Sequence, residues 1–289
     1  MVLNKRSVEQ VVHGSAHLDG ASKSTTTSTP SSNAAPHKSD KERLSQIQQQ
    51  RIARQQKQAA AKAGSGGFVN NKTYVNAAGL FMFFFYCAMM YYRYQHRGAI
   101  GFADSLWTCN IAVLFGWVAV VLNKPYIISM GLCATFIVHA IWVVDVVTWF
   151  ATGSFPLGNA EYISWPNITW GEIITSTHHA WFVPLGMSLL HRNGGYRGGA
   201  WFYAFLIAIP TILISLLFPK ELIMPNGDVF YLNINCAHEW WKDVRGWPFS
   251  LIPYEQPQYL MFLYAFSFFL FSVTHIVLKL ISYVTIRAH

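Results

Sequence analysis

Charged residues are scarce in this sequence. Asp, Glu, Lys and Arg make up 12% of the 289 residues and hydrophobic residues make up 53%, whereas a soluble domain carries about 25% charged residues. The charge is also concentrated, because residues 1–72 hold eleven basic and four acidic residues, which gives +7 of the formal net charge of +8. This distribution disfavours nucleic-acid binding and indicates a membrane protein whose basic tail lies beside anionic lipid.

Paired cysteines, a secretory leader and a metal-binding motif are also missing. The spacing of Cys87, Cys109, Cys133 and Cys236 indicates neither a disulfide framework nor a zinc ribbon. Residues 1–10 are polar and lack the apolar core of a signal peptide, so we expect the first spanning helix to direct insertion. Because no HExxH motif or comparable spacing is present, we expect neither a metal nor another cofactor.

Residues 1–67 are predicted to form a disordered basic tail. Ser24–Asn33 is almost entirely low-complexity sequence, from which no core can be built. A capping box at Ser39–Glu42 predicts a helix at about 41–63 that is polar nearly all round. This helix is either a solvated juxtamembrane helix or a binding site for a cytosolic partner, and Gly64–Gly67 is a flexible link.

Six apolar runs follow in residues 68–289, each near the ~20 residues that cross a bilayer as a helix. The predicted fold is therefore all-α, a polytopic membrane bundle of about six transmembrane helices. The runs lie at about 75–92, 106–122, 126–150, 173–190, 199–218 and 259–281. Basic loop residues are more frequent on the side of the tail, so we expect both termini in the cytoplasm.

The connection between the fifth and sixth runs is too long for a plain loop. Its residues 229–241 read VFYLNINCAHEWW, which is apolar, too short to span, and interrupted by Asn233, Asn235, His238 and Glu239. We expect a re-entrant or interfacial segment over the mouth of the bundle, where protein or water can cover irregular backbone. A short seventh helix is the alternative.

Ionisable side chains inside the apolar runs mark the expected site, because such groups are costly within a membrane. His178 and His179 begin the fourth run about 100° apart on a helix, so at most one of them should face a given site. Thr175 lies one turn before His179, and Pro184 loosens the backbone after it. This arrangement favours His179 as a general base, while His178 is expected to pack or to hydrogen-bond a neighbouring helix.

The second and third runs also carry polar groups. Asp104 or Ser105 is expected to cap the second helix, and Asn110, a turn deeper, to make a hydrogen bond between helices. His139 and Asp145 are six residues apart, or about 600° of helical turn, so they do not share a face and each needs a partner from elsewhere.

Parts of the second and fourth runs resemble the androgen-induced and androgen-dependent intramembrane hydrolases and their membrane acyltransferase relatives. The matching stretches are LWTCNIAVLFGWVAVVL, from Leu106, HHAWFVPLGMSLL, from His178, and more loosely GWPFSLIPY at Gly246–Tyr254. Proteins of that superfamily are six-helix bundles with a Thr or Cys nucleophile in an early helix. A His five positions before a Pro, in a middle helix, is their base. The NIN at Asn233–Asn235 is also similar to uncharacterised multipass membrane proteins of bacteria and protists.

The resemblance implies an acyl hydrolase or acyltransferase that acts on a lipid ester. The nucleophile position falls at Thr108 or at Cys109, and the base at His179, five residues before Pro184. A hydroxyl or thiol becomes nucleophilic when a base removes its proton, and an imidazole can do this near neutral pH. Asp145 would support the base. The oxyanion of the intermediate could be bound by Asn110, Asn233 or Asn235, and other polar residues expected to be buried are His139, His178 and His238.

Two other functions stay open from the sequence. A small-solute or proton transporter would use His139, Asp145 and His178 as a relay, although internal repeats are absent. A non-catalytic scaffold would use the tail to recruit a cytosolic partner. Membrane lipids are the expected surroundings in each case, a lipid-like molecule is the expected substrate of the enzyme, and no nucleic acid is expected to bind.

Overall fold

The computed structural model describes residues 45–52, 67–191, 193–224, 227, 229–241 and 249–287. Residues 45–52 are helical and belong to a unit separate from the rest, within the helix predicted at about 41–63. The other predictions for residues 1–66, including disorder, lie outside the described residues. The same is true of the first part of the segment Gly246–Tyr254.

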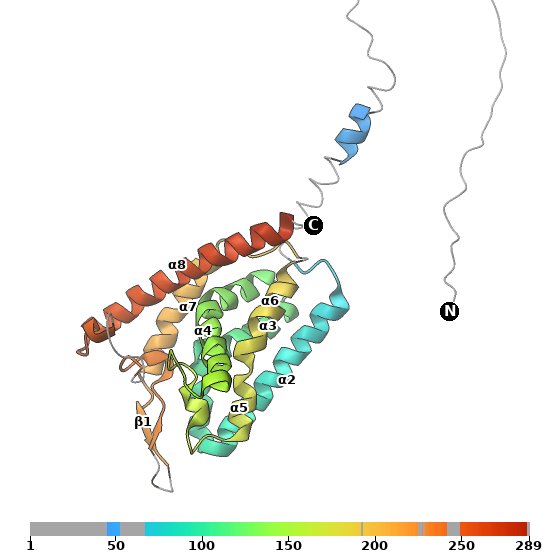
Figure 1. The fold of residues 1–289 in the computed structure, drawn as a ribbon. Coiled ribbons are helices and arrows are strands. Elements are labelled where there is room, and N and C mark those ends of the chain that lie inside the picture. The colour runs from blue at the N-terminus through green and yellow to red at the C-terminus, as the bar shows by residue number, and fades with distance from the viewer. Residues whose placement is uncertain are drawn as a thin grey trace, which may run out of the picture. The chain divides into compact units, whose positions relative to one another are not determined.

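The larger unit is mostly helical, as predicted (Figure 1). Its α-helices are α2 (Lys72–Arg97), α3 (Thr108–Val121), α4 (Pro125–Thr152), α5 (Trp170–Ser176), α6 (His178–His191), α7 (Ala200–Ser215) and α8 (Gln258–Arg287). Four 3-10 helices join them: η1 (Gly98–Leu106), η2 (Glu161–Ser164), η3 (Ile234–Cys236) and η4 (Phe249–Leu251). Each predicted apolar run falls on one of these α-helices, except that the fourth run is divided between α5 and α6.

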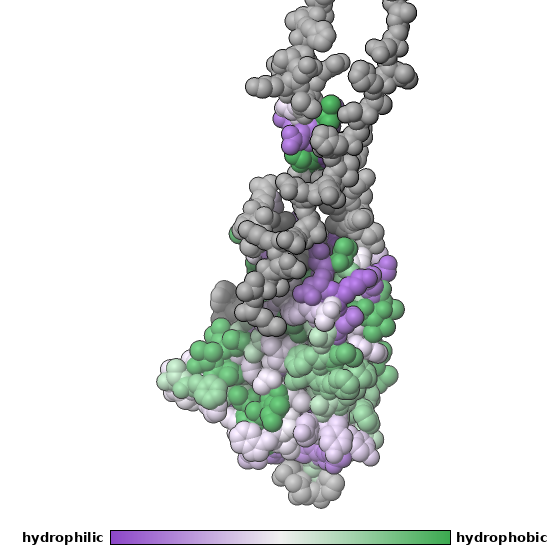
Figure 2. All heavy atoms as spheres, turned by 90° about the vertical axis from the view of Figure 1, so that its right-hand side faces the viewer, coloured by the Kyte–Doolittle hydropathy of each residue, from purple (hydrophilic) through white to green (hydrophobic). Residues whose placement is uncertain are grey.

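Among the residues that the structure describes, three helical segments are long and apolar enough to cross a membrane, judged by length and composition. They are Lys72–Leu106, Pro125–Thr152 and Gln258–Thr285, and the shorter helices α3 and α7 are also apolar. Figure 2 shows hydrophobic residues over much of the middle of one face of the molecule, with hydrophilic residues toward its upper and lower ends. Leu80, Phe81 and Phe84 of α2 are among the large apolar side chains that the fold leaves exposed.

Helix α4 is central, since it packs against α3, α6, α7 and α8, while α2 and α8 lie on opposite sides of the unit (Figure 1). Pro125 stands in the first turn of α4, and Gly153 ends it with the left-handed φ of 76°, an arrangement that suits both residues. Small residues allow close contact between helices. A Cβ at Gly131 would lie 3.3 Å from carbons of Ala112 and Phe182, so α4 can approach both α3 and α6.

The fourth apolar run contains a break that the sequence analysis does not predict. Thr169 caps α5 in a capping box with Glu172, and the helix ends at Ser176. Thr177 separates it from α6, which starts at His178. Because of the break, the two histidines stand in the first turn of a new helix rather than inside a continuous one.

The segment 229–241 forms neither a seventh helix nor any α-helical structure. Strand β1 (Glu221–Ile223) pairs antiparallel with β2 (Val229–Tyr231), and η3 follows. Asn233 and Asn235 have φ values of 22° and 54°, in the left-handed range where Asn is tolerated and an α-helix is interrupted. Among the described residues the fold therefore departs from all-α by one short hairpin, and Asn233, Asn235 and Cys236 adopt positive φ values in the irregular turn after it.

Candidate functional site

A cavity of about 600 Å³ lies among the helices, within the size range of ligand pockets. It is called the central cavity below. Its walls come from α2, η1, α3, α4, the connection before α5, the start of α6, the hairpin, α7 and α8. The wall formed by α7 and α8 is apolar except for Ser267, and its apolar residues are Ala208, Ile212, Leu263, Phe266, Leu270 and Phe271.

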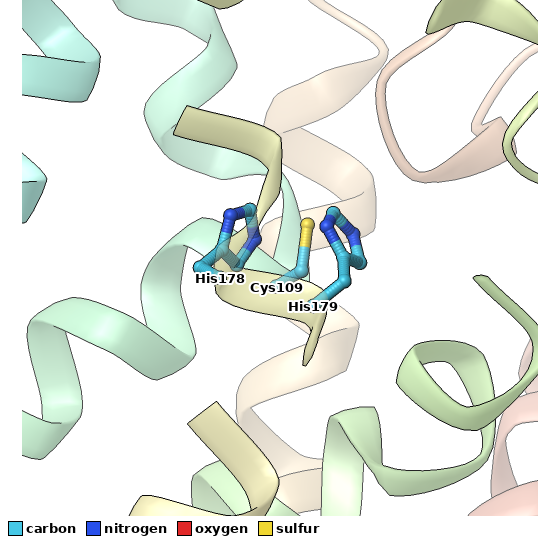
Figure 3. A group of neighbouring side chains, drawn as sticks. All are labelled: Cys109, His178 and His179. Atoms are coloured by element: carbon cyan, nitrogen blue, oxygen red, sulfur yellow. The ribbon is translucent and has the colours of Figure 1, made fainter. Parts of the chain in front are cut away.

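A thiol and two imidazoles meet at another part of the cavity lining. The Cys109 Sγ and one ring nitrogen from each of His178 and His179 lie within 4.8 Å of one another. All three residues line the central cavity, and the sulfur points into the space between the two rings (Figure 3). We call these three residues the thiol–imidazole cluster.

Backbone carbonyls fix both imidazoles of the cluster. The Nδ1 of His178 lies 2.7 Å from the Thr175 carbonyl oxygen, and the Nδ1 of His179 lies 2.8 Å from that of Ser176. A carbonyl can only accept a hydrogen bond, so each Nδ1 carries a proton and each Nε2 is left as the basic nitrogen. The Thr175 hydroxyl instead donates to the Gly171 carbonyl, so it does not orient His179 as predicted.

The prediction that only one of the two histidines faces the site is wrong. Their ring centroids are 4.1 Å apart, and both residues belong to the cluster. The prediction used the angular spacing of Cα atoms in a regular helix. It did not include the break at Thr177, nor the hydrogen bonds that orient both rings toward the backbone carbonyls of the preceding turn.

Behind the cluster, α4 supplies two aromatic neighbours. The rings of His139 and His179 are 4.8 Å apart between centroids, and Trp142 stacks on His179 at 5.1 Å with an interplanar angle of 17°. His139 is 1% exposed, and neither of its ring nitrogens has a hydrogen-bond partner among the described residues. His139 therefore packs beside the cluster without being tied to a polar partner.

Thr108 lies next to Cys109 but is engaged elsewhere. Its Oγ1 donates to the Asn235 Oδ1 at 2.9 Å, and its backbone N–H donates to the same oxygen. The Asn235 amide nitrogen donates to the Leu106 carbonyl and to the Ser215 hydroxyl. Asn235 thus caps the start of α3 from the hairpin side. Both of its amide hydrogens are used there, so it is a poor donor for an oxyanion.

The other predicted amide donors occupy different positions. Asn110 donates to the Asp104 carbonyl at 2.7 Å, which leaves it one further N–H, and it lines the central cavity. Asn233 is fully buried and donates to Tyr231 and to the Glu239 carbonyl. It also accepts from the backbone N–H of His238, whose Nε2 bonds the Phe218 carbonyl. His238 and Asn233 thereby hold the turn after β2, and Asn110 is the predicted amide nearest to Cys109.

Asp145 is not placed as the predicted partner of a catalytic histidine. Its buried carboxylate accepts hydrogen bonds from the backbone N–H groups of Leu157, Asn159 and Ala160 at 2.7, 2.6 and 3.0 Å. Three such bonds, all from backbone groups of the irregular connection after α4, satisfy the hydrogen-bonding capacity of the carboxylate. Asp145 therefore stabilises that connection, whose residues form part of the cavity wall.

Two arginines and two carboxylates form a buried network at the same cavity. Arg93 and Arg97 pair with the Asp104 Oδ2 at 3.1 and 2.9 Å, and both also pair with Glu172. The His96 Nδ1 lies 2.8 Å from the Glu172 Oε2. We call these residues the arginine–carboxylate network. Asp104 is thus an ion-pair partner, and neither it nor Ser105 is the predicted helix cap, because Trp107 occupies the cap position without a side-chain hydrogen bond.

The network keeps Glu172 ionised. Burial alone opposes ionisation, but the charges of Arg93 and Arg97, with hydrogen bonds from Arg97 and His96, lower the pKa of this carboxyl from 4.5 to about 2. One signal could have revealed the network in the sequence. Arg93 and Arg97 are four residues apart and so lie on one helix face, at the end of an apolar run where unpaired charges would be costly.

Tyr162 is a cavity residue that the sequence analysis missed. It belongs to η2, and its hydroxyl accepts a 3.0 Å hydrogen bond from the Trp142 Nε1. Burial raises the pKa of Tyr162, so the phenol stays protonated and can donate a hydrogen bond into the cavity. No sequence pattern distinguishes this tyrosine from the many others, because its position depends on the fold of the connection before α5.

Comparison of the chain with protein-family models, with curated proteins and with solved structures finds no match. The resemblance to the intramembrane hydrolases and acyltransferases therefore stays a prediction from short stretches of sequence.

Proposed function

We propose that this protein is a multipass membrane enzyme that transfers or hydrolyses the acyl group of a lipid ester, with Cys109 as nucleophile. The observation that supports this function is the thiol–imidazole cluster, in which the Sγ and the ring nitrogens lie within 4.8 Å of one another. The cluster opens onto a cavity with an apolar wall, which suits an acyl chain.

The membrane part of the proposal rests on hydropathy. Besides the three long apolar segments, α3 and α7 are apolar helices of 14 and 16 residues, and α5 with α6 covers the fourth run. Six crossings would place both termini on one side, which the basic tail indicates is the cytoplasm, and would expose the α2–α3, α4–α5 and α7–α8 connections on the other side. Tests of accessibility at Ser154 and at residues 45–52 from each side of sealed vesicles would check this topology.

The reaction proceeds in two steps. As the Cys109 Sγ attacks the ester carbonyl carbon, its proton moves to the Nε2 of His179, because transfer during the attack avoids a free thiolate in a buried site. The tetrahedral intermediate expels the alkoxide, which takes the proton from His179 and leaves as the alcohol, and a thioester remains on Cys109. Water or an acceptor hydroxyl, deprotonated by the same imidazole, then attacks the thioester. The acid or the new ester leaves, and the proton returns from His179 to the Cys109 sulfur.

Cys109 is a better candidate than Thr108 for the nucleophile. The Thr108 hydroxyl donates a hydrogen bond to an amide oxygen, the Asn235 Oδ1, which is not a base. The Cys109 thiol also donates to an amide oxygen, the Asn110 Oδ1 at 3.7 Å, but its sulfur in addition lies within 4.8 Å of a ring nitrogen of both His178 and His179. The nucleophile thus stands one position after the threonine that the resemblance would select first. The remaining N–H of Asn110 and the Tyr162 hydroxyl are the proposed donors to the oxyanion.

An acyl-enzyme trapping experiment tests this function. Full-length protein in lipid nanodiscs is mixed with a long-chain p-nitrophenyl ester, and the adduct is located by mass spectrometry. We expect an acyl group on Cys109 that neutral hydroxylamine removes, as it removes thioesters but not threonine esters. His179→Ala should slow its formation by about 10²- to 10⁴-fold.

Cys236→Ser is the matched control, because Cys236 lines the same cavity but is not part of the cluster. Thr108→Val should also retain the adduct. An adduct that survives in Cys109→Ala, or one that resists hydroxylamine, would contradict the proposed nucleophile. The proton-relay alternative is less well supported, because the carboxylate of Asp145 is engaged by the connection after α4.

A further inference from the structure

The thiol–imidazole cluster has the ligand chemistry of a transition-metal site. Among the described residues, Cys109, His178 and His179 are the group of cysteine, histidine and acidic side chains whose ligand atoms converge, within 4.8 Å of one another. We infer that these three residues bind one divalent ion of the zinc or cobalt class. This inference goes beyond the proposed function and does not depend on it.

Both imidazoles are prepared as ligands. Metal-binding histidines commonly donate their other ring N–H to a backbone carbonyl, which fixes the tautomer and the ring orientation. The bonds from Nδ1 to the carbonyls of Thr175 and Ser176 have this form and leave each Nε2 with a free lone pair. The Nε2 of His178 is buried and has no hydrogen-bond partner among the described residues, so a ligand is what would satisfy it.

The identity of the ion follows from the donor atoms. One thiolate sulfur with two neutral imidazole nitrogens suits borderline-soft ions such as Zn²⁺, whereas Mg²⁺ and Ca²⁺ prefer oxygen. Around tetrahedral zinc, with bonds of about 2.0 Å to nitrogen and about 2.3 Å to sulfur, neighbouring ligand atoms are about 3.5 Å apart. The cluster would have to contract by about 1 Å, which small side-chain rotations can provide.

Three protein ligands leave one coordination position open. All three residues line the central cavity, so the open position would face it and accept water or a cavity ligand, as in catalytic rather than structural zinc sites. His139 lies beside His179 but is not in the converging group. We therefore assign no ligand role to His139.

Metal binding and acyl transfer would use the same atoms. An ion held by the Cys109 sulfur and both Nε2 atoms occupies the nucleophile and the base together. The metal-bound protein should therefore not form the acyl thioester, and zinc should protect Cys109 from alkylation. The two ideas can still fail separately, because metal binding is measured without substrate and the acyl adduct is measured in chelator.

Cobalt substitution tests the site. Full-length protein is purified in detergent with a chelator, freed of the chelator, and titrated with Co²⁺. We expect saturation at one ion per chain, with the visible bands of tetrahedral cobalt and a thiolate-to-cobalt charge-transfer band that zinc displaces. Cys109→Ser should lose the charge-transfer band, and His178→Ala and His179→Ala should each weaken binding at least tenfold.

Two controls match the ligands in residue type and location. Cys236→Ser replaces another thiol of the same cavity, and His139→Leu replaces an imidazole that contacts the cluster without belonging to it; both should retain the wild-type spectrum. If the ligand variants fail to fold, X-ray absorption of zinc-loaded wild-type protein decides, with one sulfur and two nitrogen ligands expected. Absence of saturable binding, a metal shell without sulfur, or loss of the spectrum in either control would overturn the assignment.

Discussion

The two polar groups that line the central cavity differ in how their charges and hydrogen bonds are satisfied. In the arginine–carboxylate network, Arg93 and Arg97 are balanced by Asp104 and Glu172 through ion pairs of 2.6 to 3.1 Å and the Arg97–Glu172 contact. The thiol–imidazole cluster contains formally neutral groups, and its His178 Nε2 is buried without a hydrogen-bond partner among the described residues. The Arg93 Nε, the Arg97 Nε and the Asp104 Oδ1 of the network also lack a hydrogen bond there, but each belongs to a group whose charge an ion pair balances. Arg93, Arg97 and Asp104 line the same cavity as the cluster.

This difference separates the structural role of the network from the proposed functional role of the cluster. Buried charges are tolerated when they are paired, and removing one member leaves the others uncompensated. A buried polar atom without a partner lowers stability, and the unpartnered Nε2 of His178 belongs to a residue of the converging group, which His139 does not join. The network therefore holds α2, η1 and α5 together, while the cluster carries the proposed chemistry.

The largest expected effect comes from a substitution that disrupts the arginine–carboxylate network. Glu172→Gln leaves two buried guanidinium groups facing only Asp104 and should destabilise the protein by about 3–5 kcal/mol. Denaturation of the detergent-solubilised protein, followed by fluorescence-detected size exclusion, would measure the change. The control is Glu255→Gln at an exposed position, where little change is expected. Equal stability of the two variants would show that the network is not structural.

Acid should weaken the same network. The pKa of Glu172 is lowered on folding from 4.5 to about 2, so its stabilisation is fully present above pH 4.5 and is lost as pH falls toward 2. The total loss is on the order of 3 kcal/mol at 1.36 kcal/mol per pKa unit. Unfolding midpoints measured from about pH 6 to about pH 3 should fall more steeply for wild type than for Glu172→Gln. Parallel profiles of the two proteins would show that protonation of Glu172 does not cause the loss of stability in acid.

Asp145 extends the comparison to a carboxylate satisfied by backbone groups alone. Asp145→Asn keeps the shape but loses the charge and one acceptor oxygen, so some of the N–H groups of the connection after α4 lose their partner. We expect a loss of about 1–3 kcal/mol in the same unfolding assay. Ser154→Ala in that exposed connection should change stability by no more than about 0.5 kcal/mol, and an equal loss there would contradict a specific role for Asp145.

The smallest expected effect has the opposite sign. His139→Leu removes a buried imidazole whose two nitrogens have no partner among the described residues, and it should raise stability by about 1 kcal/mol. His275→Leu is the matched control, because the His275 Nδ1 bonds the Tyr196 hydroxyl at 3.1 Å and its loss should lower stability. Destabilisation by His139→Leu of the same size as that by His275→Leu would show that His139 is satisfied in the folded protein.

The helices were largely predictable because their signals are local. The third apolar run, predicted at 126–150, forms α4 from Pro125 to Thr152, since continuous hydrophobicity, a proline in the first turn and a glycine after the end all agree. The break at Thr177 was missed, because the hydropathy of a run does not change when a single helical turn is interrupted. The β1–β2 hairpin was missed for a related reason, since three-residue strands are too short to show an alternation of apolar and polar residues.

The sequence by itself determined that this chain is an apolar helical protein with polar residues in specific helices, because composition and periodicity act over short distances along the chain. Only the tertiary structure decided which of those residues meet. Cys109 and His179 are 70 positions apart, and their approach depends on how α3, α4 and α6 pack. The same packing places Asp145 against the backbone N–H groups of the connection after α4 and Thr108 against Asn235. A side chain forms hydrogen bonds with the partner that the fold brings within reach.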